Sequence, residues 1–510
     1  MPRLPVAFVL ALLAQLALPA IAHADDPPQP VEAPQPAGTA PAQAEPESEP
    51  EQEPAEDDEP LHEDDEIGPL IFIEAIEITG NTATQSEIIR RALPIQPGDI
   101  LHSSDRRLRD TRFKVLALGY FRDVTLAMRK GSARGQVILE IHVVERGTFV
   151  LNRLWFGTNP YSPYWFGTDI GERNLLGMGV SIGGGVIYAA HGNVAGSRDQ
   201  WAGELRLADA SLLGTRWGAQ GSLTLVHGSD PYRVAGTGDD PSDFNAFPYR
   251  RFGGRWGATY DLSALSRIAM TLRAEEISAD LPVAPTQVLP GGVVAPVDLH
   301  LLPGESRVVT AGLGFDRDTR PDPVLPHSGD RIMLAAEVGT DAIGSDYNFA
   351  TFFGRYEHWW PIDDERWTVG ARLVGGVVIG EAPRFDRLYI SDVDPQLTPR
   401  ALGLVLSTAQ PFDILGTRDI KPQYGDVGGV ATIEVARRIF RGTGANRVYG
   451  GDAFVAVGLW GLADSDEVRL RDTSVWDALP IDLYADAGLR IDTDIGIFEL
   501  TIGNALGRLR

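Results

Sequence analysis

The feature that most constrains the fold is a pair of alternating segments within residues 305–340, joined by a turn with three prolines. In the first segment apolar residues recur at every second position: Val309, Ala311, Leu313 and Phe315. The second segment repeats the pattern at Ile332, Leu334, Ala336 and Val338. A period of two is the signature of a β-strand. Each segment has about 10 to 13 residues, which exceeds most soluble strands and suits a tilted strand that crosses a membrane.

The rest of residues 148–510 continues this pattern and is predicted to form an all-β antiparallel transmembrane barrel. Fifteen candidate strands cover 149–158, 164–174, 178–190, 199–210, 216–228, 250–262, 266–279, 305–316, 329–341, 346–361, 366–380, 428–440, 449–462, 482–491 and 495–506. Short turns alternate with four longer polar loops, at 229–249, 280–304, 381–427 and 463–481. This asymmetry is typical of outer-membrane barrels, although a large soluble β-protein is an alternative.

The strand count raises a question of parity, because bacterial barrels have even numbers of strands. A fifteenth strand would leave the end of the chain outside the cell. We therefore expect about 16 strands. Either one strand is hidden within residues 229–304, or the final strand is missing and the seam of the barrel is unusual.

Residues 1–24 have the pattern of a secretory signal peptide. Arg3 supplies the charged region, residues 6–18 are apolar, and Ala22-His23-Ala24 form a cleavage site. No later run of 18 apolar residues occurs, which argues against a helical membrane protein. The chain has no cysteine, so disulfides, thiolate metal sites and cysteine nucleophiles are excluded.

Residues 25–68 form a tract rich in Pro, Ala, Gln and Glu, with 16 acidic residues and no Lys or Arg. Such a tract cannot bury enough apolar surface to offset the entropy of ordering it, so it is predicted to be disordered. It contributes −16 to the formal net charge of −25. The acidity argues against a nucleic-acid partner, and a solvated spacer is the interpretation of the tract that we favour.

Residues 69–147 combine strand and helix patterns and are predicted to be a separate α+β domain. Alternation over residues 71–78 indicates a strand, and Thr84 is a candidate N-cap for a helix that follows. A second helix is expected from Ser103 or Ser104 to Gly119, before two strands near 120–128 and 137–145. The predicted order is β-α-α-β-β.

This order, with three short sequences, resembles a POTRA domain, the periplasmic module that precedes the barrel in BamA/TamA-type and two-partner-secretion proteins. The matching sequences are ITGN at 78–81, LGYFRDV at 118–124 and VVERG at 143–147. An edge strand of such a module can pair with an unfolded client strand. The alternative is a rigid spacer that orients the barrel.

The barrel region resembles that of the BamA/TamA-type outer-membrane protein assembly family. The turn of the opening hairpin carries the family-like residues Asp318, Thr319, Arg320, Pro323, Pro326 and Gly329. Two further matches are GERNLLGMG at 171–179 and WPIDDERWTVGARL at 360–373. The resemblance implies a barrel in the lipid bilayer of the bacterial outer membrane, with the POTRA domain and the acidic tail in the periplasm.

The resemblance also implies a latch, in which an arginine at the tip of a long outer loop pairs with carboxylates inside the barrel. The corresponding loop, 381–427, lacks the Arg-Gly-aromatic tip of the family. Arg400 is the first candidate for the latch and Arg418 is the alternative, with Glu434 and Asp486 as candidate acceptors. A buried pair of this kind would hold the loop, because breaking it costs about 3–5 kcal/mol. Alternatively, both arginines are solvated.

No catalytic pattern stands out, since G-x-S-x-G, H-E-x-x-H and Walker sequences are absent and the nine histidines lack ligand spacing. We therefore expect a non-enzyme without a cofactor or metal. The leading hypothesis is that the protein inserts or translocates unfolded outer-membrane or secreted proteins through a weak seam between the first and last strands. Accessory proteins of the periplasm or outer membrane are further candidate partners. The alternatives are a secretion pore of two-partner type, and a channel or structural protein without assembly activity.

Overall fold

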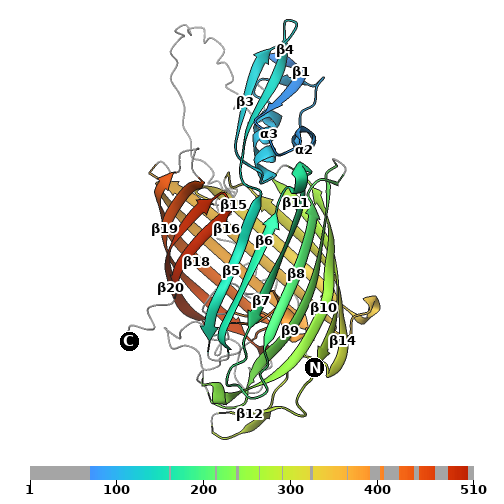
Figure 1. Ribbon diagram of the computed structural model, residues 1–510, viewed down its shortest axis with the longest axis vertical. Coiled ribbons are helices and arrows are strands. Elements are labelled where there is room, and N and C mark those ends of the chain that lie inside the picture. The colour runs from blue at the N-terminus through green and yellow to red at the C-terminus, as the bar shows by residue number, and fades with distance from the viewer. Residues whose placement is uncertain are drawn as a thin grey trace, which may run out of the picture. The chain divides into compact units, whose positions relative to one another are not determined.

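The structure is a computed structural model that describes residues 69–159, 162–212, 215–236, 240–263, 265–289, 291–321, 325–363, 366–390, 402–406, 424–441, 447–465 and 481–503. The predicted signal peptide and acidic tract, residues 1–68, lie outside these ranges. The described residues form a small N-terminal domain and a large sheet of fifteen strands (Figure 1).

The N-terminal domain contains β1 (Leu70–Thr79), α2 (Ser86–Ala92), β2 (Ile100–His102), α3 (Arg106–Ala117), β3 (Phe121–Lys130) and β4 (Gln136–Glu145). Its sheet has the order β2-β1-β4-β3, in which β1 and β4 are parallel and the other neighbours antiparallel. The two helices lie in the connection that a parallel pair requires. Buried residues of the sheet and the helices share one core, which includes Ile73, Ile89, Val115, Leu139 and Ile141. Among the described residues, no helix has the length and apolar composition needed to cross a membrane.

The predicted POTRA-like fold is confirmed, but its details differ in three places. The short strand β2, which pairs with the start of β1, is an addition to the expected order. Thr84 does not cap α2, because its hydroxyl accepts a hydrogen bond from Asn174 of the large sheet at 2.9 Å. The cap of α3 is Asp105, which accepts from the backbone N–H of Arg107 at 2.7 Å, and not either of the preceding serines. Several short polar residues suit such caps, and the folded loop selects among them.

The large sheet follows chain order from one edge to the other. Its strands are β5 (Phe149–Asn159), β6 (Ser162–Glu172), β7 (Val180–Ala189), β8 (Gln200–Asp209), β9 (Trp217–Arg233), β10 (Phe244–Asp261), β11 (Ser266–Ala279), β14 (Gly304–Asp318), β15 (Gly329–Gly339), β16 (Phe349–Ile362), β17 (Trp367–Gly380), β18 (Val427–Arg441), β19 (Val448–Ala463), β20 (Ile481–Thr493) and β21 (Gly496–Gly503). All neighbours are antiparallel, and the sheet curls into a nearly closed barrel (Figure 1). The fifteen strands are close to the expected 16.

Residues 229–304, where a further barrel strand was one of the expected possibilities, instead contain extensions of β9 and β10. β9 and β10 pair from Trp217 with Tyr260 to Arg233 with Phe244, so residues 229–233 and 244–249 of the expected loop are strand. The segments β12 (Thr286–Val288) and β13 (Val294–Pro296) form a separate two-stranded sheet. Within this extension Phe247 is buried, and the buried carboxylate of Asp230 accepts hydrogen bonds from Arg384 and Tyr424.

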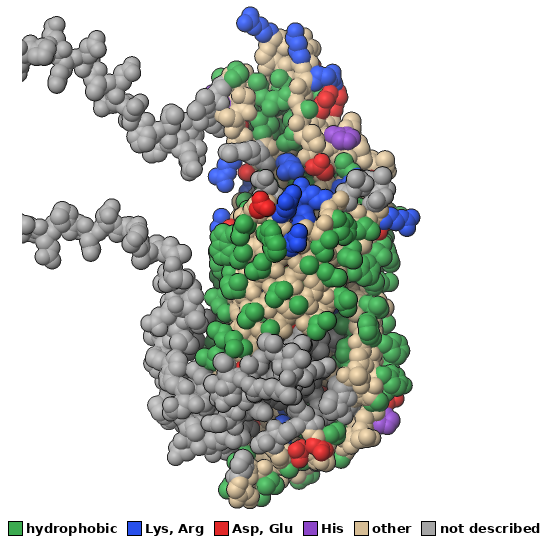
Figure 2. All heavy atoms as spheres, turned by 90° about the vertical axis from the view of Figure 1, so that its left-hand side faces the viewer, with side chains coloured by type: hydrophobic (Ala, Val, Ile, Leu, Met, Phe, Trp, Pro, Cys, Tyr) green, Lys and Arg blue, Asp and Glu red, His purple; other side chains and the backbone are tan. Residues whose placement is uncertain are grey.

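The outward face of the barrel is apolar. Large side chains on this face are exposed along the strands, such as Leu272 at 61%, Leu313 at 59% and Ile433 at 54%. They alternate with inward residues, as the period of two predicts. Figure 2 shows hydrophobic side chains over one side of the barrel wall, with Lys and Arg gathered along the edge of this region. Such a face suits the hydrocarbon of a bilayer.

We call the barrel end that contacts the N-terminal domain the proximal end, and the opposite end the distal end (Figure 1). An apolar cluster lies inside the barrel and includes the inward strand residues Val226, Tyr249, Ile277, Val308 and Val374. The same cluster includes residues that follow β17 in the chain, namely Phe385, Leu388, Ile390, Leu404 and Leu406. The segment after β17 is therefore packed within the barrel.

Candidate functional site

The turn between β14 and β15 is held by its own side chains. The hydroxyl of Thr319 accepts from the backbone N–H of Asp330 and donates to its carboxylate, both at 2.8 Å. Gly329 has a φ of +92°, and a Cβ there would lie 2.9 Å from the carbonyl oxygen of Thr319, so this position requires glycine. Pro326 is half-buried, whereas Pro323 lies outside the described residues.

Arg320 connects this turn to a buried charge cluster. Its guanidinium donates to Asp318, with Nε 2.8 Å from Oδ1 and Nη2 2.6 Å from Oδ2. It also lies 3.6 Å from Glu357 of β16, which is 1% exposed and pairs with Arg355 and Arg372. Three guanidinium groups therefore surround the buried carboxylate of Glu357. Because one of them belongs to Arg320, the turn is bound to the inner wall of the barrel.

The loop between β17 and β18, residues 381–426, is anchored inside the barrel by a second set of charges. Arg384 is 4% exposed, and its Nε donates to Asp230 Oδ2 at 3.2 Å while Nη2 donates to the carbonyl of Pro231 at 2.8 Å. Asp230 is fully buried and also accepts from the Tyr424 hydroxyl at 2.7 Å. Since Arg384 begins the loop and Tyr424 ends it, both ends converge on one carboxylate of β9.

Two more ion pairs tie the same loop to other strands. Arg273 of β11 donates to both carboxylate oxygens of Asp386 at 2.7 Å, and its Nε lies 3.3 Å from Glu337 of β15. Arg387 lies 3.1 Å from Asp464, which directly follows β19. The described part of the loop is thus bound to strands on several sides of the barrel and crosses its interior.

The predicted latch is only partly within the described residues. Arg400 and Arg418 lie outside them, so their role stays a prediction. Glu434 faces inward and binds Arg490 of β20, with Nη2 2.8 Å from Oε2. Asp486 lies on β20 opposite Ala456, on the same face as Arg490. The structure therefore places both predicted acceptors inside the barrel and gives Glu434 a partner that sequence reasoning did not consider.

Sequence reasoning also missed the anchors Arg384 and Asp386. The available signal was the run Arg384-Phe385-Asp386-Arg387, which places three charges around an aromatic residue between apolar segments. A search for an Arg-Gly-aromatic tip passes over it, because the aromatic residue follows the arginine directly. Their partners Asp230 and Arg273 lie on distant strands and carry no local signal.

The edge strands β5 and β21 meet at the proximal end. There the backbone N–H of Leu151 donates to the carbonyl of Ile495 at 2.7 Å. A Cβ at Gly496 would lie 2.9 Å from the carbonyl oxygen of Leu151, so the two chains are in close contact. Beyond this point the described residues of β5 and β21 form no ladder with each other. In a sheet of fifteen antiparallel strands the first and last run in the same direction, so the two edges of this seam are parallel.

The linker from the N-terminal domain reinforces the proximal end of the seam. Arg146 Nη2 lies 3.3 Å from Asp492 Oδ1 of β20, and both side chains are only about a tenth exposed. Gly147 lies against the turn between β20 and β21, where a Cβ would come within 2.5 Å of the carbonyl oxygen of Asp494. The linker therefore holds the turn that leads into β21.

A second contact joins the N-terminal domain to the turn between β6 and β7. Glu145 accepts from the backbone N–H groups of residues 82–84. Burial alone would raise the pKa of Glu145, but the hydrogen bonds from this loop outweigh burial and lower the pKa to about 2. The ordered loop presents Thr84 to Asn174, and the Tyr120 hydroxyl donates to a carbonyl of the same turn at 3.1 Å. Two of the family-like sequences, VVERG and GERNLLGMG, are thus linked through the loop of residues 82–84.

Within the described ranges, no group of three or more His, Asp or Glu side chains is placed to hold a metal ion. The arrangement offers instead a strand seam, a barrel interior closed by a buried loop, and a domain attached beside the seam.

Comparison with known proteins agrees with this architecture. A family profile described as POTRA, surface antigen variable number repeat, matches residues 71–146, and the Omp85 superfamily domain matches residues 174–461. The outer membrane protein assembly factor BamA of Neorickettsia risticii (strain Illinois) is 36% identical over 113 residues. That stretch covers 21% of this chain and only 14% of the relative.

Solved structures with the same fold have little sequence identity to the chain. CdiB from Escherichia coli matches with a TM-score of 0.54 at 11% identity, covering 85% of this chain and 72% of that one. BamA from Haemophilus ducreyi lacking POTRA domains 1–3 gives a TM-score of 0.47 at 14% identity, covering 85% and 80%. At these identities the CdiB match supports the barrel-plus-domain fold alone.

Proposed function

Because the chain belongs to the Omp85 superfamily and is an outer-membrane β-barrel, we propose that it assists the insertion of unfolded proteins into the outer membrane through the seam between β5 and β21. The observation that carries this proposal is the seam itself. Every other neighbouring pair in the sheet is joined by a ladder, whereas β5 is bonded at the proximal end to the turn that precedes β21, through Leu151 and Ile495. The backbone N–H and C=O groups of an open edge are a template for another strand.

The direction of the two edges defines what such a strand would look like. Because β5 and β21 run in the same direction, one strand entering between them from the opposite direction would be antiparallel to both. The proximal contacts of Leu151 and Gly147 would act as a hinge, and separation would begin at the distal end. The seam can therefore receive a client strand without disrupting the joint at the N-terminal domain.

We further propose that the N-terminal domain lies in the periplasm and receives the clients. Its edge strand β3 pairs on one side with β4, which leaves the other side open among the described residues for an extended client segment. Accessory periplasmic proteins are candidate partners of the same domain. No chemical step is needed for this role, so we propose that the protein is not an enzyme.

A secretion pore is the second candidate, because the fold is shared with CdiB. A pore requires an open interior, and here the described residues of the β17–β18 loop occupy the barrel with buried ion pairs and an apolar core. Secretion through the barrel would therefore require this loop to leave. Lateral insertion does not require it, which is why we favour insertion.

Engineered disulfides test the seam, since the chain has no cysteine of its own. One pair replaces Leu151 and Ile495 at the proximal end, and another replaces Phe156 and Ile502 toward the distal end. A control pair replaces the ladder partners Ala336 and Phe352. Insertion of newly made outer-membrane proteins into vesicles containing the purified protein is then measured before and after reduction.

We expect the distal disulfide to lower insertion severalfold and reduction to restore it, while the proximal and control disulfides have little effect. Unchanged insertion with the distal pair fully oxidised would favour the channel or structural alternative. If no distal disulfide forms in any neighbouring register, a different strand closes the barrel and the assigned seam is wrong.

A further inference from the structure

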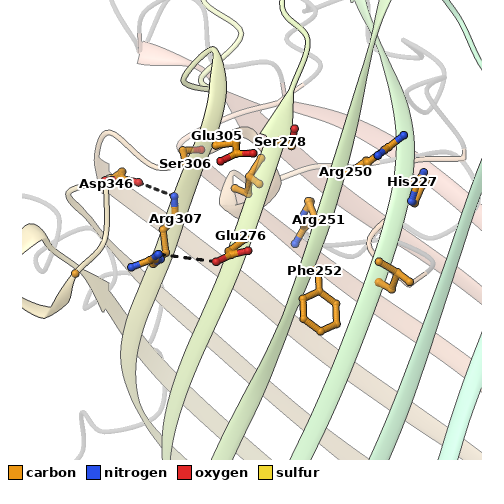
Figure 3. A pocket seen from close by; sticks show the side chains of 13 residues that line it. His227, Arg250, Arg251, Phe252, Glu276, Ser278, Glu305, Ser306, Arg307 and Asp346 are labelled. Atoms are coloured by element: carbon orange, nitrogen blue, oxygen red, sulfur yellow. Dashed lines mark hydrogen bonds and ion pairs between the residues drawn. The ribbon is translucent and has the colours of Figure 1, made fainter.

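An open pocket of about 470 Å³ lies near the distal ends of β9, β10, β11 and β14, and a row of outward side chains leads away from one side of it (Figure 3). The ladders place Tyr188, Trp201, His227 and Arg250 side by side, one on each of the four consecutive strands β7 to β10. His227 and Arg250 also line the pocket. We call these four residues the aromatic–cation row.

The cationic end of the row has no anion beside it. Arg250 is exposed, and among the described residues none forms a hydrogen bond or ion pair with its side chain. Its guanidinium is directed toward His227, its ladder partner on β9 (Figure 3). The carboxylate of Glu276 on β11 pairs instead with Arg307, which lies 3.8 Å away. Two groups that can each carry a positive charge therefore face each other, and both can donate hydrogen bonds to one external anion.

The other end of the row is a surface of aromatic rings. Trp201 stacks on His227 with ring centres 4.3 Å apart, which covers one face of Trp201, and 40% of the residue remains exposed. Tyr188 follows on β7, where its hydroxyl donates to Asp199 at 2.8 Å, and the exposed Tyr164 lies beside it with ring centres 6.4 Å apart. The electron-rich faces of such rings attract the C–H groups of a sugar ring. The row therefore joins an anion site to a surface that suits a saccharide.

The row lies where the apolar wall of the barrel ends. One step toward the middle of the barrel, the ladder partners Phe252 and Leu225 are exposed. Below the aromatic end, the ladder partners Leu205 and Leu223 continue the exposed apolar surface. A molecule bound at the row therefore meets polar groups at its distal end and a lipid-facing surface at the other, which is the polarity of a membrane lipid.

We propose that the aromatic–cation row binds a phosphorylated glycolipid, whose headgroup joins a phosphate to a sugar ring, in the leaflet at the distal end of the barrel. With the N-terminal domain in the periplasm, as proposed above, this is the leaflet of the cell surface. The phosphate accepts hydrogen bonds from Arg250 and His227, because guanidinium and phosphate form charge-assisted bonds. The sugar packs on Trp201 and Tyr188, and the acyl chains follow Phe252 down the wall.

The test uses the full-length protein in nanodiscs that contain equal parts of phosphorylated lipid A, lipid A without its phosphates, and phosphatidylglycerol. The lipids that remain bound after mild detergent extraction are identified by native mass spectrometry. We expect phosphorylated lipid A to be enriched roughly fivefold over its share of the bilayer, since exposed charged contacts contribute modestly. Arg250→Gln should abolish this enrichment. Trp201→Leu, which keeps an apolar side chain but removes the ring, should reduce the preference for phosphorylated lipid A over phosphatidylglycerol.

The matched control is Arg307→Gln, which removes the other exposed arginine of the same pocket, one that already pairs with Glu276. It should leave the enrichment unchanged, and a heat-shift gel confirms that all variants keep a folded barrel. A wild-type protein that retains the bulk lipid mixture would overturn the proposal. Equal enrichment of phosphatidylglycerol would also overturn it, because the sugar would then not be recognised. Equal enrichment of lipid A without phosphates, or an equal loss in Arg307→Gln, would exclude Arg250 as a specific anion site.

The leaflet is tested separately, because it depends on the proposed orientation of the N-terminal domain. Val283, which follows β11 at the distal end, is 98% exposed, and Ala133 lies exposed in the turn between β3 and β4. In intact cells a membrane-impermeant maleimide should label Val283→Cys and leave Ala133→Cys unlabelled. The reverse result would place the row in the periplasmic leaflet and overturn the proposal even if the purified protein binds lipid A.

Discussion

The wall formed by β9 and β10 and the seam between β5 and β21 are built from the same kind of strand but differ in how they are held. In the wall, the ladder runs without a break along the whole of both strands, from Trp217 to Arg233. The buried loop adds the pair of Arg384 and Asp230 to the inner side of the same strands. At the seam, a backbone hydrogen bond joins Leu151 of β5 to Ile495 in the turn before β21, and the described residues of β5 and β21 form no ladder.

This difference indicates where the barrel can open. Stability in a protein is distributed unevenly, and the regions that open are those with few backbone bonds and few buried contacts. The seam has these properties and the wall does not. A barrel that accepts a client strand needs one seam with few backbone hydrogen bonds. The other strand pairs must be stable enough to keep the opening at that seam.

The largest effect is expected from Asp230→Asn, a substitution in the wall. The substitution leaves Arg384 buried without its anion, and such a loss costs about 3–5 kcal/mol. The unfolding free energy in detergent, measured with urea, should fall by this amount. Conductance of the protein in a planar bilayer should also rise, because the loop is no longer held in the barrel.

The double variant Asp230→Asn/Arg384→Met is the control for this effect. It removes both charges, so it should be less unstable than the single variant. A loss of less than about 1 kcal/mol for Asp230→Asn alone would contradict the assignment of this pair as the anchor of the loop.

A smaller effect is expected from Gly147→Ala, which acts at the hinge of the seam. The new Cβ would lie 2.5 Å from the carbonyl oxygen of Asp494, so the linker must move away from the turn. Overpacking of this kind costs about 1–3 kcal/mol. Hydrogen exchange should accelerate at residues 149–151 and remain unchanged in β9 and β10. Gly375→Ala is the control, since the nearest atom to its Cβ lies 4.0 Å away, and it should change neither region.

A pH effect is expected at the joint beside the seam. The pKa of Glu145 is lowered from 4.5 to about 2 in the folded protein, so its stabilising contribution is complete above about pH 4.5. This contribution is lost as the pH falls through about 2. Protection of the amides of residues 82–84 should decrease over this range. Glu145→Gln should weaken the same protection at neutral pH by about 1–2 kcal/mol, because a neutral acceptor forms weaker hydrogen bonds. A variant with full protection would show that the carboxylate does not order the loop.

The smallest effect is expected from Arg267→Gln, which removes an exposed ion pair from the wall. Arg267 Nε lies 2.6 Å from Asp261, but the two side chains are 44% and 31% exposed. Exposed pairs contribute less than about 1 kcal/mol, so urea unfolding should hardly change. A loss as large as that of Asp230→Asn would mean that surface charges, rather than the buried loop, hold the wall.

The local architecture of the barrel follows from the sequence alone. The alternation in residues 305–340 predicted the hairpin of β14 and β15, and the same period predicted all fifteen strands. The turn residues Thr319 and Gly329 were named from the family resemblance, and in the structure their contacts are formed within the turn itself. Periodicity and turn chemistry are local properties, so they can be read from a single chain.

Which charged residues form pairs is visible only in the three-dimensional fold. Arg384 and Asp230 are 154 positions apart, and each lies in a segment whose local pattern does not point to the other. Thr84 suits a helix cap, yet a turn 90 positions later recruits its hydroxyl. The extension of β9 and β10 through an expected loop depends on the burial supplied by the segment after β17. Burial and pairing of polar groups are set by what the fold brings together across the barrel, and a linear pattern does not contain that information.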